Sequence, residues 1–175
     1  MVRIAGLDLA ALPKNPTGWA LMEGRKIETR LLYGDEEIMG MVRDKKPQLV
    51  AIDAPLSLPR SGIYRKADEE MIKRGYRVFP PVIPSMKKLT LRAMELVASL
   101  REEEVDVIEI HPLSTRKALG MPLRDPGEIS KTFEALGFEL SGGRTIHELD
   151  AATAALTGLL HIKGLTEELG DCLLY

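Results

Sequence analysis

The chain has 175 residues, of which 45% are hydrophobic and 29% are charged, and its formal net charge at neutral pH is −2. These values predict one globular domain with a sizeable core, and they exclude the overall basic character that marks many nucleic-acid-binding proteins. The single cysteine excludes a disulfide framework within the chain and fits a reducing compartment. The N-terminus has no signal-peptide pattern and no apolar run is long enough to span a bilayer, so we expect a cytoplasmic protein without a membrane partner. Only two side chains, Asn15 and Gln48, are amides, a bias typical of heat-adapted sources.

The first predicted element is a strand over residues 2–8, with the sequence VRIAGLD. Its four apolar residues predict a strand buried on both faces, in the centre of a sheet. The strand ends at Asp8, and the carboxyl end of such a strand is where open α/β sheets bind ligands. Taken alone, Asp8 is equally well interpreted as a solvated acid at the end of a strand.

Two more strands are predicted before any helix, over residues 18–22 (GWALM) and 26–33 (KIETRLLY), joined as a hairpin. This order argues against a doubly wound sheet, in which a helix follows the first strand. The sequence GLDLAALPK also lacks the glycine pattern of dinucleotide-binding loops and of P-loops. We therefore expect a mixed sheet without a glycine-rich phosphate loop.

A helix is predicted over residues 35–44, with Asp35 as its N-cap. The apolar run of residues 49–52 (LVAI) then predicts a short buried strand that ends on Asp53. Prolines shortly after this strand prevent it from continuing, so Asp53 should lie at the same sheet edge as Asp8.

Residues 59–92 carry nine basic and three acidic residues, in a chain whose net charge is negative. Three aromatic residues are interleaved with them, and this mixture suits a phosphate backbone with unstacked bases. An alternative is that the helices predicted over about 63–74 and from residue 85 onward only have solvated faces, as the spacing of Lys88 and Arg92 suggests. The prolines in residues 79–84 predict an extended connector between these helices. The candidate substrate-binding residues are Arg60, Arg65, Lys66, Arg74, Arg77 and Lys87.

A third acid also stands near the end of a predicted strand. Residues 105–110 (VDVIEI) predict a strand, and Glu109 stands near its end. A short helical turn over 115–119 and a helix over 125–137, with an N-cap, a first-turn proline and a terminal glycine, come next. The final ten residues are expected to return against the core.

The last helix is predicted to begin after the flexible residues 141–143. Thr145 and Glu148 form a capping box, which gives Glu148 a structural role. His147 and Asp150 lie three positions apart on one face of this helix. Asp150 lies beside the apolar stripe, where a carboxylate is costly to bury unless it is paired or bound to a metal. The alternatives are an interaction of Asp150 with the helix N-terminus and a partly exposed first-turn position for His147.

Parallel strands that end in Asp8, Asp53 and Glu109 would bring three carboxylates to one sheet edge, which Asp150 could reach from the last helix. Carboxylates at such short range repel one another unless a cation lies between them. Ligands that are all oxygen favour Mg²⁺ or Mn²⁺ over zinc. Two such ions about 4 Å apart can activate a water and stabilise the leaving oxygen in phosphodiester hydrolysis. The candidate metal ligands are Asp8, Asp53 and Asp150.

The ordered segments GLDLA, TGWAL, AIDAPLSLP, EIHP and HELDAATAAL resemble a family of predicted nucleases with an RNase H-like fold, the domain of unknown function 429. The resemblance covers nearly the whole chain and implies an α/β fold: a five-stranded mixed sheet, its second strand antiparallel, flanked by helices. It also implies that Asp8 and Asp53 match the first-strand and fourth-strand acids of that fold. His147 and Asp150 are similar to the H-x-x-D or D-x-x-D pair on the last helix of RuvC-like resolvases. Glu109 matches a family motif but no standard metal ligand of the wider fold.

We therefore predict a nuclease that uses Mg²⁺ or Mn²⁺ in a two-ion mechanism. Asp8 would bridge the two ions, and Asp53 and Asp150 would complete the sites. Glu109 or His147 would position or deprotonate water. These five residues are the candidate catalytic set.

The predicted organisation is one domain, residues 1–175, in which residues 59–92 form a basic helical insertion that holds DNA or RNA. The sequence leaves the oligomeric state open, a homodimer included. A module on the same fold that binds nucleic acid without turnover is an alternative. A receiver domain with Asp53 as phospho-acceptor would need a helix after the first strand and a lysine at the end of the last strand. An ATP-handling relative of the sugar-kinase and actin class would normally need two such domains and glycine-rich loops.

Overall fold

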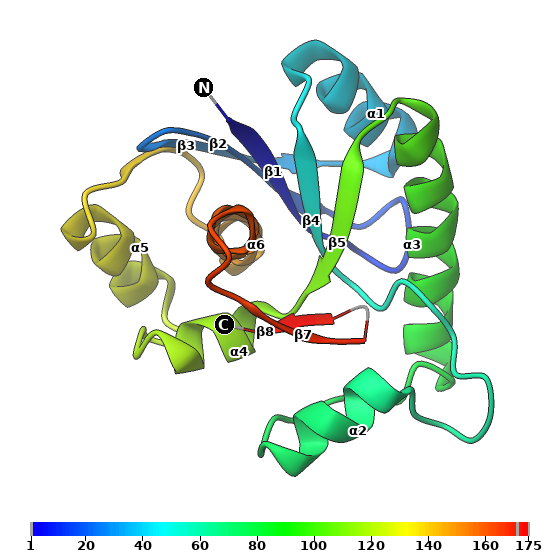
Figure 1. Cartoon of the computed structure of the whole chain (residues 1–175). Helices are drawn as coiled ribbons and strands as arrows, with labels where there is room; N and C mark the ends of the chain where they lie inside the picture. The colour runs from blue at the N-terminus through cyan, green and yellow to red at the C-terminus, as the bar shows by residue number, and fades with distance from the viewer. Residues whose placement is uncertain (1, 171, 175) are drawn as a thin grey trace.

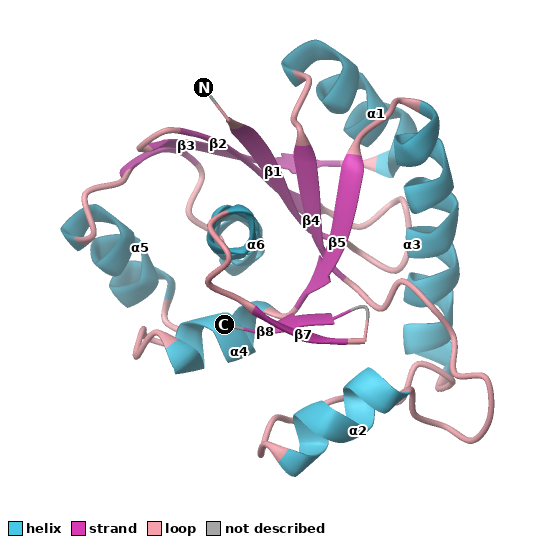
Figure 2. Cartoon of the chain, in the orientation of Figure 1, coloured by secondary structure: helices cyan, strands magenta, loops and turns pink. Residues whose placement is uncertain are grey.

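The computed structural model describes residues 2–170 and 172–174, which form one mixed sheet covered by helices on both faces (Figures 1 and 2). The strands are β1 (Arg3–Asp8), β2 (Thr17–Glu23), β3 (Lys26–Leu32), β4 (Leu49–Asp53), β5 (Asp106–Ile110), β6 (Glu139–Gly142), β7 (Glu167–Leu169) and β8 (Cys172–Leu174). The helices are α1 (Gly34–Lys45), α2 (Lys66–Lys73), α3 (Pro84–Glu102), α4 (Pro112–Ala118), α5 (Pro126–Ala135) and α6 (Ile146–Ile162). None of the described helices has both the length and the apolar character needed to cross a membrane.

The sheet has the order β6-β3-β2-β1-β4-β5-β8-β7. Its five central strands are those expected from the sequence: β2 is antiparallel to β1 and β3, and β4 and β5 continue parallel to β1. The hairpin of β2 and β3 directly follows β1, whereas a receiver domain would have a helix at that point. The five-stranded mixed sheet is therefore present, and three short strands extend it.

These additional strands correct one expectation and add detail to another. Residues 141 and 142 belong to β6, which pairs in parallel with β3, and are not part of a flexible linker. The hydroxyl of Thr29 also donates to the carbonyl of Ser141 at 3.1 Å. The last segment of the chain forms β7 and β8, with β8 parallel to β5. The expected flexibility was inferred from glycines, which here suit a short edge strand.

Two apolar cores lie on opposite faces of the sheet. One packs Leu7, Trp19 and Ile52 against α1 and α3. The other packs Ile4 and further strand residues against α5 and α6. Figure 1 shows α6 on one side of the central strands and α1 with α3 on the other. The continuous apolar character of β1 and β4 follows from this double coverage.

The polar contacts of α1 and α3 differ from the expectation. The N-cap residue of α1 is Tyr33, not Asp35, and its N–H donates to the carboxylate of Glu37 at 2.5 Å. Asp35 forms an ion pair with Arg92 at 2.8 Å, and the Arg92 side chain is only 6% exposed. Arg92 also donates to the carbonyl of Ala10, so it ties the loop that follows Asp8 to both helices and is not part of a solvated face.

The basic segment of residues 59–92 leaves the sheet after β4 and returns through α2 and α3. Helix α2 is shorter than expected, and its apolar residues Ala67 and Met71 pack against Leu169 of β7. The connector between α2 and α3 has no regular structure until Pro84, as its prolines predict. The later helices have the predicted caps: Asp125 accepts from the Glu128 N–H, and Thr145 and Glu148 form a capping box.

Candidate active site

Asp8 and Asp53 end adjacent parallel strands at the same level. They are direct partners in the register of β1 and β4, so both carboxylates lie at the carboxyl edge of the sheet. Asp150 reaches this edge from the second turn of α6. One carboxylate oxygen from each residue lies within 4.8 Å of the others. The structure thus brings together the three acids that the sequence selected as metal ligands.

Two glycines allow α6 to approach the sheet closely enough for this contact. A Cβ on Gly6 would overlap the backbone carbonyl of Ala151, and a Cβ on Gly18 would overlap that of His147. Only glycine permits such a close approach between a strand and a helix backbone. The first two turns of α6 therefore lie directly over the ends of β1 and β2.

Burial raises the pKa values of all three carboxylates, and neighbouring acids add to this effect at Asp8 and Asp53. Burial and the charges of Asp8 and Asp150 raise the pKa of Asp53 well above its usual value. The pKa values of Asp8 and Asp150 are also raised, mainly by burial. An additional positive charge at this point would favour all three ionised forms.

His147 contacts Asp8 directly. Its Nδ1 atom lies 2.6 Å from Oδ2 of Asp8, and its side chain is 50% exposed. This contact lowers the pKa of Asp8 and so opposes the effect of burial. His147 therefore lies beside the acids with part of its ring accessible to solvent.

Arg116 of α4 is a part of the site that the sequence analysis missed. Its side chain is 1% exposed, and Nη2 lies 2.6 Å from Oδ1 of Asp150. It also donates to Oγ1 of Thr153 at 3.0 Å and to the carbonyl of Leu123 at 2.9 Å. This buried guanidinium lowers the pKa values of the three acids, although burial outweighs it. Its sequence neighbourhood, a charged pair in a short helix, gave no signal of burial.

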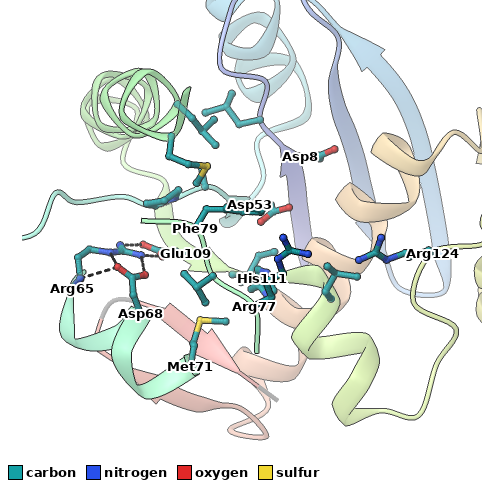
Figure 3. Close-up of a pocket in the computed structure, with 18 residues that line it drawn as sticks. Asp8, Asp53, Arg65, Asp68, Met71, Arg77, Phe79, Glu109, His111 and Arg124 are labelled. Atoms are coloured by element: carbon teal, nitrogen blue, oxygen red, sulfur yellow. Dashed lines mark hydrogen bonds and ion pairs between the residues drawn. The ribbon is translucent and has the colours of Figure 1, made fainter. Parts of the chain in front are cut away.

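Glu109 lies outside the cluster of three acids. Both of its oxygens accept from Arg65 at 2.7 Å, and Oε2 also accepts from the N–H of Leu56 at 2.8 Å. Arg65 in turn pairs with Asp68 at 2.7 Å. Figure 3 shows this ion-pair cluster at the far side of the pocket from Asp8. Because these groups satisfy one another, we remove Glu109 from the catalytic candidates and Arg65 from the substrate-binding ones.

The other basic candidates are exposed on the surface of the insertion. Arg74 forms an ion pair with Glu167, whereas Arg77 lies with its guanidinium carbon 5.3 Å from the centre of the Phe79 ring. Like Arg77, three further candidates are exposed and form no ion pair with any described residue: Arg60, Lys66 and Lys87. Of the six candidates, only Arg65 and Arg77 line the pocket next to the acids.

This pocket has a volume of about 490 Å³ and opens beside Asp8 and Asp53 (Figure 3). Arg124, from the loop between α4 and α5, also lines it and was not recognised in the sequence. His111 forms part of the wall, and burial together with the charge of Arg116 lowers its pKa to about 4. A neutral His111 is consistent with its Nδ1 accepting from the N–H of Ser114 at 3.3 Å, as the N-cap of α4.

The donor atoms of the cluster fit a hard divalent cation. Asp8, Asp53 and Asp150 offer only carboxylate oxygens, without a cysteine or histidine among the three. Mg²⁺ and Mn²⁺ are bound in proteins by such ligands, and a cation would offset the burial and the acidic neighbours that raise the pKa of Asp53. The three acids thus form a possible metal-binding site.

Comparison with known proteins identifies the family. A family model described as "Protein of unknown function (DUF429)" matches residues 6–128, which is more than half of the chain. The chain belongs to the DUF429 family. No curated protein is similar enough in sequence to match this DUF429 chain.

Two solved structures of RuvC from Thermus thermophilus are similar to this DUF429 protein. The one described as RuvC in complex with Holliday junction substrate has 15% sequence identity and a TM-score of 0.61. The one described as the RuvC structure has 16% identity and a TM-score of 0.53. Each covers 94% of this chain and 98% of the RuvC chain. The DUF429 chain therefore has the RuvC-like form of the RNase H fold, as its sequence resemblance implied.

Proposed function

We propose that this DUF429 protein is a nuclease that hydrolyses phosphodiester bonds of nucleic acid with Mg²⁺ or Mn²⁺. The observation that carries the proposal is the cluster of Asp8, Asp53 and Asp150, whose ligand atoms lie within 4.8 Å of one another at the edge of the sheet. Its position on a RuvC-like fold supports the same assignment, because one of the similar structures is described as a complex with a Holliday junction substrate.

Each acid has a distinct surrounding, which suggests its role. Asp8 is the register partner of Asp53 and contacts His147, and it would be a ligand of a bound cation. Asp53 is flanked by acids, so its charge depends most on a bound cation. Arg116 fixes Asp150 by an ion pair at 2.6 Å. Bound Mg²⁺ or Mn²⁺ would supply an activated water and positive charge for the leaving oxygen.

His147 is the residue that we assign to proton transfer. Its Nδ1 is held by Asp8, which fixes the orientation of the ring, and half of the side chain is accessible from solvent. An imidazole is the side chain most often used as a general base or acid. Glu109 has no such freedom because Arg65 and the Leu56 N–H occupy its oxygens.

The substrate would approach over the basic insertion. Arg60, Lys66 and Lys87 are exposed there, and Arg77 and Arg124 line the pocket beside the acids. Exposed cations of this kind bind the phosphate backbone of DNA or RNA largely without regard to sequence. Affinity should therefore fall steeply as the salt concentration rises.

The test is cleavage of a labelled panel of single-stranded, duplex and branched DNA and RNA with Mg²⁺ or Mn²⁺. We expect metal-dependent cleavage by the wild type, a loss of about a hundredfold or more in Asp8→Asn, and no cleavage in EDTA. Asp44→Asn is the matched control, because Asp44 lies exposed on α1 and the change should leave the rate unaltered. Cleavage that survives in Asp8→Asn contradicts the mechanism, and binding without cleavage by the wild type contradicts the enzymatic assignment.

A further inference from the structure

We propose that the pocket beside the three acids binds one unpaired nucleotide of the substrate strand, with its base against Phe79 and its phosphates at Arg77 and Arg124. This inference rests on the proposed function and names its class of substrate. The preferred substrates are then nucleic acids with an unpaired nucleotide, not continuous duplex.

The size of the pocket suits a single nucleotide. Its volume of about 490 Å³ lies within the range of roughly 300–1,000 Å³ that is typical of sites for small molecules. A base that is paired and stacked inside a duplex cannot enter a concave site of this kind, so an enzyme that uses one acts on extruded or single-stranded nucleotides.

The walls of the pocket are more apolar than a phosphate backbone requires. They include Leu9, Pro55, Met71, Met86, Leu89 and Leu113. Phosphates need only cationic or N–H donors, whereas the faces of a nucleobase favour apolar and aromatic partners. The combination of apolar walls with arginines therefore matches the two halves of a nucleotide.

Phe79 is the aromatic residue available for stacking. It lines the pocket with 52% of its surface exposed, so its ring is accessible to a ligand. The Arg77 guanidinium lies over its ring at 5.3 Å, and bases stack on arginine planes as well as on aromatic rings. The prolines that follow Phe79 restrict the connector, so little conformational freedom is lost when a base binds.

Two arginines of the pocket wall are available for phosphates. Neither Arg77 nor Arg124 has an acidic partner within 4 Å among residues 2–170 and 172–174. The acids Glu109 and Asp68 on the opposite wall are already engaged by Arg65. The unpaired guanidinium groups can therefore form charge-assisted hydrogen bonds with phosphate oxygens.

The pocket and the candidate active site are continuous, because Asp8 and Asp53 line both. A nucleotide held with its base at Phe79 therefore places a neighbouring phosphodiester near the carboxylates. The pocket would then determine which phosphodiester is presented to the acids.

The experiment uses Phe79→Trp as a fluorescent reporter. The one native tryptophan, Trp19, is fully buried in the sheet, so its emission should not respond to ligand. In EDTA, which prevents cleavage, we expect single-stranded oligothymidylate of about ten nucleotides to quench the introduced tryptophan by stacking, and the matching blunt duplex to quench it weakly. Tyr33→Trp is the control, because Tyr33 is similarly exposed on the surface outside the pocket and its replacement should show no quenching.

Affinity measurements with the same oligonucleotides separate stacking from charge. We expect Phe79→Ala to weaken single-strand binding about tenfold, Phe79→Tyr to restore it, and neither change to alter duplex binding. Equal quenching by single strand and duplex, or unchanged single-strand affinity in Phe79→Ala, overturns the pocket proposal. Cleavage of the nucleic-acid panel without quenching supports the proposed nuclease function and contradicts the proposed nucleotide pocket. Quenching by oligonucleotides, with no cleavage of any member of the panel by the wild type, supports the pocket as a binding site and contradicts the proposed nuclease function.

Discussion

Among the three clustered acids, Asp53 is the one whose own negative charge is least favourable. It ends a buried strand beside Asp8, and Asp150 closes the group from α6. Burial and these two neighbouring acids raise the pKa of Asp53. Arg116 is the buried cation beside the group, and its ion pair is with Asp150. A residue arrangement of this kind destabilises the metal-free fold and is typical of functional sites.

The raised pKa values predict how stability varies with pH. In the folded state all three acids hold protons more tightly than in the unfolded chain, so the folded protein should lose stability as pH rises from about 4 through the raised pKa values. Asp53→Asn should reduce this loss and should be more stable than the wild type above that range. Urea unfolding in EDTA between about pH 4 and pH 8 measures the free energy of unfolding of both proteins.

Metal binding should show the opposite dependence, because the cation needs ionised carboxylates. The increase in Tm on adding Mn²⁺ should grow with pH in the wild type and be much smaller in Asp53→Asn. Asp44→Asn, on an exposed helix face, should behave as the wild type. If the stability of the wild type and that of Asp53→Asn varied with pH in the same way, the ionised form of Asp53 would not be disfavoured in the folded protein.

For single residues, the sequence predicts the place of a side chain when the side chain has a fixed position on a strand or helix. Asp8 and Asp53 could be placed because they end apolar strands, and Asp150 because of its helical spacing. The ion pairs of three other charged residues could not be predicted: Arg116, Arg65 and Glu109. Their partners come from segments distant in the chain, and their burial depends on packing. A charged residue in a short helix or loop looks the same whether it is solvated or paired.

The critical contact between elements is that of α6 with β1 and β2. Gly6 and Gly18 remove the side chains that would otherwise hold the helix away from the strands. The close approach places His147 and Asp150 over the carboxyl end of β1 and the amino end of β2. The site therefore depends on two residues that carry no chemistry of their own.

Gly6→Ala tests this contact. Its Cβ would overlap the backbone carbonyl of Ala151, which cannot move without shifting α6. We expect a loss of about 2 kcal/mol or more in the free energy of unfolding, together with weaker Mn²⁺ binding. Gly40→Ala is the matched control: no atom lies within 4 Å of its Cβ, and in helix α1 alanine should stabilise by up to about 1 kcal/mol. Equal effects of the two changes would disprove the role of Gly6.

The elements themselves were largely predictable, because long periodic segments and capping residues carry strong local signals. The central strands, α3, α5 and α6 lie close to their expected ranges. The strands β6, β7 and β8 were missed because they are only three or four residues long, and glycine lies within β6 and next to β7. Such short edge strands are determined by their partners in the sheet and not by their own sequence.

For the whole molecule, the edge of the central sheet forms one side of the pocket and residues 59–92 contribute much of the opposing wall. The insertion is anchored by the buried ion pairs of Arg65 and by packing of α2 against β7. It thereby carries Phe79 and Arg77 to the pocket beside the acids. The RuvC-like fold could be recognised from the order of motifs, whereas the shape of the pocket could only come from the structure.

The metal-binding role of the three acids is tested most directly by a crystal soaked in Mn²⁺ and measured by anomalous scattering. We expect a peak within coordinating distance of the carboxylate oxygens of Asp8, Asp53 and Asp150, and the loss of that peak in crystals of Asp8→Asn. Soaked crystals without a peak at these three acids, or with one that is unchanged in Asp8→Asn, would contradict this role.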